Sequence, residues 1–285
     1  MTEQKDLKDV MEKSFKRALG GGISGASAMG CQVISLMWLR TTMNYQYRYG
    51  TTTSQAIKSL YKDGGIRRFY RGLGPALLQG PLSRFGDTAA NAGVLALLDS
   101  NEKTKDLPVA AKTMCASFAA ALWRVNLMPI DTLKTTLQVN GKDGLKLLAS
   151  KYRQNGVGVF YHGTLGAFSA TYVGHFPWFF TFNYLDSTIP KQEETLKKFA
   201  RNAFIGFSAS AVSDTVSNSI RVLKTTRQTY DKPISYLDAG KEIIKNDGIS
   251  GLFGRGLKTR LLANGLQGMM FTVLWKSFME IMEKK

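Results

Sequence analysis

The chain repeats one pattern three times at a fixed interval. A basic residue followed by two threonines recurs as Arg40-Thr41-Thr42, Lys134-Thr135-Thr136 and Lys224-Thr225-Thr226. An acidic or amide residue before glycine recurs, 92 residues apart each time (63 to 155 to 247), as Asp63-Gly64, Asn155-Gly156 and Asp247-Gly248. A phenylalanine follows each turn, as Phe69, Phe160 and Phe253. Self-similarity at a fixed period identifies a repeat architecture, so the 285 residues are predicted to form one body of three units.

Each unit contains two long segments rich in apolar and small residues, at roughly 14–43 and 73–99, 107–138 and 164–187, and 197–228 and 256–282. Hydropathy alone does not establish membrane spans, because no stretch has about 20 uninterrupted apolar residues. The first segment of each unit is rich in glycine, alanine and serine, and such small residues let membrane helices approach closely. The pattern therefore favours six transmembrane helices.

A short amphipathic stretch separates the two long segments of each unit, at 54–61, 144–152 and 237–246. Each has apolar residues at helical spacing and ends at the Asp/Asn-Gly turn, which is typical of a short helix lying on a membrane surface. The predicted fold class is an all-α membrane protein with three pseudo-symmetric repeats. The formal net charge of +17 indicates an acidic partner surface, either nucleic acid or anionic lipid.

This order of elements resembles the mitochondrial carrier family. The most specific match is Pro129-Ile130-Asp131-Thr132-Leu133-Lys134, which is similar to the family's Pro-x-acid-x-x-base signature. The resemblance divides the chain into an N-terminal extension, 1–13, and repeats at 13–100, 106–190 and 196–283. It implies a multi-pass protein of the mitochondrial inner membrane, with six helices around a cavity that opens alternately to either side. Charged networks would close the two ends.

The resemblance also implies bound cardiolipin, and no other cofactor or metal. In the family this lipid binds at the glycine turns and at an aromatic-basic-Gly motif that opens the second long helix of each repeat. The corresponding candidates here are Gly64, Arg71, Gly72, Gly156, Gly163, Gly248, Arg255 and Gly256. Free backbone N–H groups and the positive end of a helix attract phosphate independently of the resemblance. An ordinary turn is the alternative for each glycine taken alone.

The chain departs from the family at the positions that form the matrix gate. The family places an acid three residues before each basic residue, and each acid pairs with the basic residue of the next repeat. Here the acid and basic positions are Met37 and Arg40, Asp131 and Lys134, and Arg221 and Lys224. We expect Asp131 to meet Lys224, Lys134 to lack its partner, and Arg221 to face and repel Arg40. The cytoplasmic-gate positions, Asn91, Asp186, Ser187 and Lys276, contain no complete pair.

The family's substrate contact points fall at Leu78, at Gly174 and His175, and at Asn264. They carry no charge unless His175 counts, which argues against a nucleotide or multivalent anion bound in the usual way. His175 is expected to be a hydrogen-bonded cavity residue.

Charges elsewhere in the long segments are further cavity candidates. Arg124 and Asp214 each stand five residues before their repeat's proline position, and are expected to form an internal ion pair or, alternatively, a solute site. Arg84 and Asp87 lie three residues apart on one helix and are expected to satisfy each other.

Three functions are compatible with these patterns. Because both gates are degraded, the sequence favours the first, a structural or assembly subunit of a larger inner-membrane complex. The second is an active carrier that exchanges a small metabolite by alternating access. The third, a soluble basic repeat protein that binds nucleic acid, is disfavoured because common helical solenoids repeat every 33–47 residues or so. No nucleophile–base pair or phosphate-binding loop stands out, so an enzyme is not expected.

Overall fold

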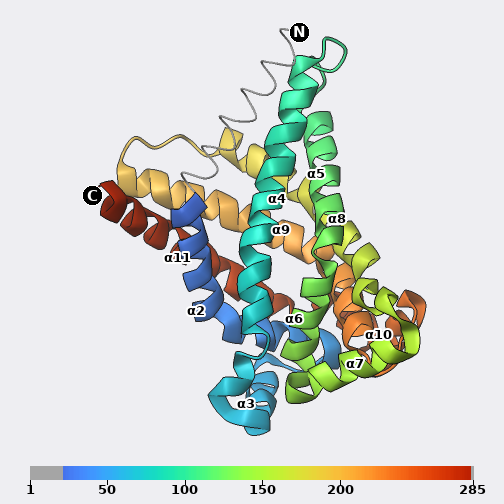
Figure 1. Ribbon diagram of the computed structural model, residues 1–285. Helices are drawn as coiled ribbons and strands as arrows, with labels where there is room; N and C mark the ends of the chain where they lie inside the picture. Colours follow the sequence, from blue (N-terminus) through green and yellow to red (C-terminus); the bar gives the residue numbers. More distant parts are fainter. Residues whose placement is uncertain (1–21, 284–285) are drawn as a thin grey trace.

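The computed structural model describes residues 22–283, except for the side chains of 22–28, 88, 91–92, 195 and 271–283 (Figure 1). The described residues form helices and turns without a strand, which confirms the predicted all-α class. No helix in this part of the chain is both long and apolar enough to span a membrane. The predicted N-terminal extension, 1–13, and the start of the first long segment lie outside the described residues.

Each repeat consists of a long helix, a short helix and a second long helix, as predicted. The first repeat contains α2 (Gly22–Tyr49), α3 (Thr53–Phe69) and α4 (Leu73–Ser100). The second contains α5 (Val109–Asn126), α6 (Met128–Asn140), η1 (Gly141–Asp143), α7 (Gly144–Asn155), η2 (Val157–Tyr161) and α8 (Thr164–Thr188). The third contains α9 (Thr195–Thr229), α10 (Tyr236–Gly254) and α11 (Leu257–Glu283).

The first long helix is interrupted only in the second repeat. There α5 ends at Asn126 and α6 begins at Met128, with Pro129 in the first turn of α6. Proline is tolerated at that position because its missing N–H would have no intrahelical partner. α2 and α9 continue without interruption past Ser35 and Ser219, the serines that replace this proline.

The predicted glycine turns are present, with one shift in register. Gly156 and Gly248 have φ of 68° and 70°, in the left-handed region that favours glycine. In the first repeat Gly65 takes this role with φ of 61°, whereas Gly64 is extended with φ of 171°. The sequence could not distinguish these neighbouring glycines, because either one would allow the turn.

The long helices form a closed ring. α2, α6 and α9 contact one another pairwise. Around them, α4 packs on α2, α5 and α6, α8 packs on α5 and α9, and α11 packs on α2 and α9. Figure 1 shows the short helices α3, α7 and α10 gathered at one end, at the bottom of the view. This is the end at which a gate is predicted.

Candidate functional site

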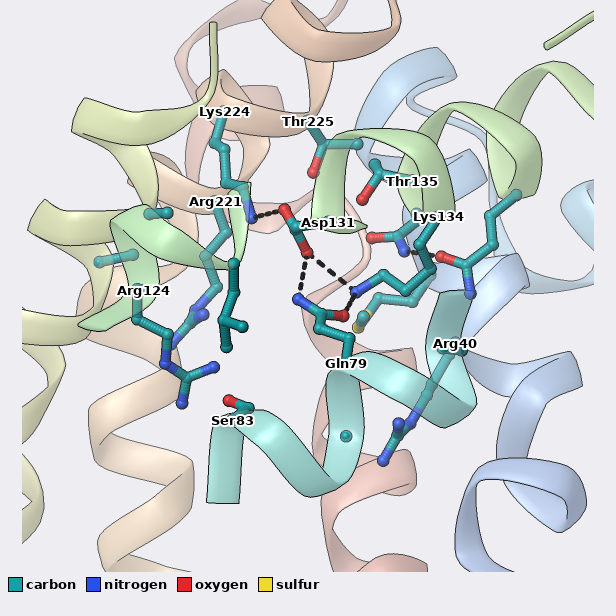
Figure 2. Close-up of a pocket in the computed structure, with 18 of the residues that line it drawn as sticks. Arg40, Gln79, Ser83, Arg124, Asp131, Lys134, Thr135, Arg221, Lys224 and Thr225 are labelled. Carbon is teal, nitrogen blue, oxygen red and sulfur yellow. Dashed lines mark hydrogen bonds and ion pairs between the residues drawn. The ribbon is translucent and has the colours of Figure 1, made fainter. Parts of the chain in front are cut away.

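A buried carboxylate joins three helices near the end covered by the short helices. Asp131, in the first turn of α6, is 5% exposed. One of its oxygens lies 2.5 Å from Nζ of Lys224 and the other 2.9 Å from Nζ of Lys134. Two amides complete its shell: Gln79 donates at 2.7 Å (Figure 2), and Gln228 donates at 3.3 Å. Each carboxylate oxygen therefore accepts a charged and a neutral donor, as a buried charge requires.

The pairing of Asp131 with Lys224 confirms one prediction, and the position of Lys134 corrects another. Lys134 does not lack a partner, because it contacts Asp131 one turn earlier on its own helix and donates to Oε1 of Gln79. Gln79 was not predicted. Its position within the repeat could have indicated it. Gln79, His175 and Asn264 each stand two residues before the equivalent positions 81, 177 and 266. Leu78, chosen in its place, is 55% exposed.

Arg40 and Arg221 do not form the predicted repulsive pair. Arg40 donates to Oε1 of Gln267 on α11 at 2.8 Å. Arg221 donates to Oγ of Ser217, one turn away on α9, at 3.2 Å. Figure 2 shows the two arginines on opposite sides of Asp131. Each guanidinium turns toward a neutral acceptor, which lowers the cost of placing two like charges near one site.

Met37, at an acid position of the family, belongs to the packed core. Its side chain is fully buried and packs with Met29, Val33 and Ala76. Its sulfur lies 3.5 Å from Nε2 of Gln138. A methionine at this position therefore replaces an ion pair by packing and a weak hydrogen bond.

A cavity of about 360 Å³ lies beside the Asp131 network. Residues from α2, α4, α5, α6, α8, α9 and α11 line it. Its described lining includes seven cationic side chains and two carboxylates, a formal balance of +5 (7 − 2): Arg40, Arg84, Arg124, Lys134, Arg221, Lys224 and Arg260, with Asp87 and Asp131. The wall is thus strongly charged, although the predicted contact points are not. The sequence missed this because most of these cations lie outside the family's contact positions.

The charges of Arg124 and Asp214 are neutralised, but not by each other as predicted. Arg124 lies 2.6 Å from Asp87 on α4. Asp214 lies 2.7 Å from Arg260 on α11 and also accepts from Asn264. Arg124 and Asp214 therefore each pair with the helix that packs beside their own, α4 beside α5 and α11 beside α9. Equivalent positions in two repeats predict that two residues lie at the same depth, but they do not determine which neighbouring helix supplies the counter-charge.

The remaining cavity candidates occupy different environments. Arg84 and Asp87 both line the cavity, and Asp87 is paired with Arg124. The ring of His175 bonds through Nδ1 to Oγ of Ser117 at 2.7 Å, between α8 and α5. It is hydrogen-bonded as predicted, but does not belong to the described lining of the cavity. The carbonyl of Gly174 accepts from a serine of α9 at 2.7 Å, so this position serves helix packing.

At the opposite end, Asp186 contributes to a loop contact. Nη1 of Arg201 lies 2.8 Å from its carboxylate, and Nη2 donates to the carbonyls of Asp186 and Ile189. Arg201 therefore ties the C-terminus of α8 to the start of α9. Ser187 donates to the carbonyl of Tyr184 within α8. The side chains of the other two positions predicted for this gate, Asn91 and Lys276, lie outside the described residues.

Three basic side chains connect neighbouring repeats at the end covered by the short helices. Each caps the C-terminus of a long helix of the following repeat, where the last carbonyls lack intrahelical donors. Arg68 donates to the carbonyls of Gln138 and Val139 at 2.8 and 2.7 Å, and pairs with Asp63. Its side chain is 3% exposed. Arg68 was not predicted, since nothing in its local sequence shows that it reaches another repeat.

Lys151 and Arg255 make the other two connections between neighbouring repeats. Lys151 donates to the carbonyl of Gln228 at 3.2 Å, and burial lowers the pKa of its amine to about 8. Arg255 donates to the carbonyls of Tyr47 and Arg48 at 3.3 and 3.2 Å and lies 2.7 Å from Asp247. Arg255, a predicted lipid contact, is 7% exposed, and its guanidinium contacts groups inside the protein. Arg71, another predicted lipid contact, is exposed.

The glycines of the three aromatic-basic-Gly motifs also face the next repeat. A Cβ on Gly72 would lie 2.9 Å from the carbonyl oxygen of Lys134. On Gly163 it would lie 2.5 Å from the side chain of Gln228, and on Gly256 2.7 Å from the ring of Tyr47. Close helix approach is thus sufficient reason for glycine at these positions, whether or not a lipid binds there.

Three helical repeats around a charged cavity, closed at one end by an ion network that joins the repeats, define a three-repeat carrier fold. The sequence pattern of the mitochondrial carrier protein family matches residues 11–98, 105–193 and 196–285. The chain therefore belongs to the mitochondrial carrier family, whose members are mitochondrial membrane proteins.

Two relatives show the extent of the similarity. The calcium-binding mitochondrial carrier SAL1 of Saccharomyces cerevisiae is 28% identical over 227 residues, which cover 70% of this chain and 42% of the yeast protein. The chain thus matches less than half of that relative's length. The mitochondrial carrier-like protein L276 of Acanthamoeba polyphaga mimivirus is 24% identical over 202 residues, 71% of this chain and 76% of the viral protein.

Proposed function

We propose that this chain is a multi-pass carrier of the mitochondrial inner membrane that moves a small solute through its central cavity, without catalytic activity. The observation that carries the proposal is a cavity lined by the long helices and closed at one end by the Asp131 network. A purely structural subunit has no evident need for a polar cavity on its axis. A carrier needs such a cavity together with an end that opens.

The strength of the closed end supports reversible opening. Alternating access requires two states within a few kcal/mol of each other. Asp131 holds Lys134 and Lys224, and neutral contacts such as the bond from Arg40 to Gln267 replace the missing ion pairs. In a buried ion pair the cost of withdrawing the charges from water offsets much of their attraction, so the net contribution of such a pair to stability is small. Such a set stabilises one state without fixing it, so degraded gate motifs are compatible with transport.

Exposed apolar side chains support contact with lipid acyl chains. Phe176, Phe180 and Tyr184 stack along the outer face of α8 and are 60%, 64% and 60% exposed. Gly72 and Gly163 are the N-cap residues of α4 and α8, and neither helix has a side-chain cap. The positive ends of these helices suit a phosphate headgroup, and we propose cardiolipin there. Carbonate-resistant retention in inner-membrane vesicles would support this location, and release by carbonate would contradict it.

Cysteine labelling from both sides of a vesicle tests transport without knowledge of the solute. Ser83 lines the cavity, and Ser83→Cys would be introduced after replacing Cys31 and Cys115 by alanine. A carrier that alternates is labelled by a membrane-impermeant maleimide added to either side. Asp106→Cys, in an exposed loop, is the control, because it reacts from one side only and reports orientation. Labelling of Ser83→Cys from one side alone would refute alternating access.

The second candidate is a structural or assembly subunit of a larger complex. Met37 and Arg221 favour it, because they remove acids from the network that would drive a transport cycle. Native electrophoresis in mild detergent distinguishes the two functions. Migration solely as a free 31.5 kDa species excludes a stable complex, whereas a larger species together with one-sided labelling of Ser83→Cys favours the structural role.

A further inference from the structure

A second cavity, of about 440 Å³, lies at the end covered by the short helices. Its wall combines parts of all three repeats: the end of α2 with α3, the end of α6 with η1 and α7, and the loop that follows α9. Figure 1 shows α3 and α7 at the bottom of the view. The described wall shares no residue with that of the central cavity. We call this second space the end cavity; the proposed carrier function gives it no role.

Apolar and aromatic side chains form part of the wall of the end cavity. Leu60 and Val139 are buried. The ring centroids of Tyr45 and Tyr49 lie 4.6 Å apart, and Tyr49 is 43% exposed. Aromatic faces attract cations, and the guanidinium of Arg48, outside the wall, already lies 5.1 Å from the ring centroid of Tyr49. A ligand that carries positive groups on an aliphatic chain would match both kinds of surface.

The charged side chains of the wall give it an acidic balance. Three aspartates and two cations sum to −1 (2 − 3), on a chain whose formal net charge is +17: Asp63, Asp143, Asp231, Arg68 and Lys146. Arg68 is already engaged, because it pairs with Asp63 and donates to two carbonyls at the end of α6. Asp143 and Asp231 form no ion pair or side-chain hydrogen bond with the described residues. Two carboxylates of the wall are therefore available to a ligand.

The polar groups that the wall leaves without partners are mainly hydrogen-bond acceptors. Oδ1 of Asn140 is buried without a hydrogen-bond partner, and ionised carboxylates only accept. Lys151 is close enough to Asp231 for electrostatic attraction, but its Nζ donates to the carbonyl of Gln228. A buried acceptor without a donor is costly. A ligand with several N–H donors would complete these groups.

We infer that the end cavity binds a small organic polycation of the aliphatic polyamine class. Its ammonium groups would donate to Asp143, Asp231 and Oδ1 of Asn140. Its methylene chain would pack on the apolar and aromatic part of the wall. The described residues contain no group of three or more His, Cys, Asp or Glu side chains that could hold a metal ion. An extended organic cation therefore suits this wall better than a bare divalent metal ion.

The position of the end cavity links its ligand to the closed state. The wall is complete only while the ends of α2 and α6 and the loop after α9 are together, and opening of this end separates the repeats. A ligand that contacts all three repeats binds the closed state better, so it shifts the equilibrium toward that state. Binding itself does not depend on transport, whereas this regulatory effect rests on the proposed carrier function.

Thermal stability of the full-length protein tests binding. The measurement uses neutral detergent without added anionic lipid, because such lipid attracts cations itself. The probes are spermidine and putrescine, each compared with sodium chloride and magnesium chloride at constant ionic strength. We expect a saturable rise in Tm with spermidine, since a ligand that binds the folded state stabilises it. No rise above the sodium chloride baseline, or an equal rise with magnesium chloride at equal concentration, would overturn the inference.

Matched variants assign the effect to the end cavity. Asp143→Asn and Asp231→Asn should each weaken the apparent affinity for spermidine by about tenfold, because each removes a charged hydrogen-bond acceptor. Both aspartates are exposed, so the variants should fold. Asp106→Asn, in an exposed loop outside the wall, is the control and should leave the affinity unchanged. Equal affinities in the wild type, Asp143→Asn and Asp231→Asn would overturn the inference.

Cysteine labelling tests the link to the closed state. In the Ser83→Cys background, spermidine at ten times its Kd should slow labelling from the side that the Asp131 network closes by about tenfold. Labelling from the opposite side should not slow, and Asp231→Asn should abolish the effect. Saturable binding with an unchanged labelling rate would overturn the regulatory effect.

The two proposals fail separately. Two-sided labelling of Ser83→Cys without saturable polyamine binding supports the carrier and overturns the end-cavity site. Polyamine binding that depends on Asp231, together with one-sided labelling, supports the site and overturns the carrier.

Discussion

Replacing Asp131 by asparagine removes the carboxylate that Lys134 and Lys224 share, while keeping the shape of the side chain. Asp131 is 5% exposed, and the two lysine side chains are 19% and 17% exposed. Removing one partner from a buried ion pair costs about 3–5 kcal/mol, because the remaining charge stays buried. Here two ammonium groups remain and also repel each other. We therefore expect a loss near the upper end of this range for the state in which the network is formed.

The loss has two measurable consequences. A change of about 3–5 kcal/mol lowers the Tm of the purified protein by about 5–15 °C. The same change shifts an equilibrium between two states by a factor of about 10²–10⁴, so the closed end opens. In the Ser83→Cys background, Asp131→Asn should therefore increase the labelling rate from the side that the network closes, at least tenfold.

Controls separate the network from a general effect of lost charge. Asp106→Asn removes an exposed aspartate and should change Tm by less than about 1 °C, since surface substitutions are usually near neutral. The double variant Asp131→Asn with Lys224→Met should recover part of the loss, because one unpaired ammonium is removed. If Asp131→Asn matches Asp106→Asn in both Tm and labelling rate, the network does not stabilise the closed end and the reasoning is refuted.

Three further predictions concern residues at the contacts between repeats. Arg68→Ala should lower Tm by about 5–15 °C because it leaves Asp63 and two helix-end carbonyls unpaired, and a loss no larger than that of exposed Arg67→Ala would contradict this. The pKa of Lys151 is lowered from 10.5 to about 8, so the unfolded chain binds more protons between these values and the free energy of unfolding should rise with pH by about 3 kcal/mol. Chemical unfolding from pH 8 to 10.5 should show a flatter rise for Lys151→Met, and identical slopes would exclude the effect. Gly256→Ala should destabilise by about 1–3 kcal/mol because φ is 66° and Tyr47 is close, whereas Gly206→Ala, with nothing near its Cβ position, should not.

The repeat pattern predicted the helices well because their signals are local. Apolar spacing and the glycine turns each act within one or two turns of the chain, and the helices and turns appear where these signals stand. The break before α6, inside the predicted segment 107–138, was not predicted. The ion pair of Asp131 with Lys224 was also predictable, since it follows from the register of the repeats. The choice between Gly64 and Gly65 was not, because both allow the same turn.

Pairing between distant side chains required the tertiary structure. Arg124 binds Asp87 and Asp214 binds Arg260 because α4 packs on α5 and α11 on α9. Arg68 likewise bonds to the end of α6, in the next repeat. A repeat period fixes the depth of a residue along its helix, but not its rotation about the helix axis or the identity of its nearest counter-charge.

The sequence by itself therefore determined the repeat architecture, the all-α class and the family of this protein, because these depend on periodicity and on short motifs. Only the tertiary structure decided that the cavity is cationic, since the charge of a cavity is a sum over side chains from six long helices. Burial increases the energetic cost of this net charge, because charges withdrawn from water must be neutralised by neighbours or by a bound ion.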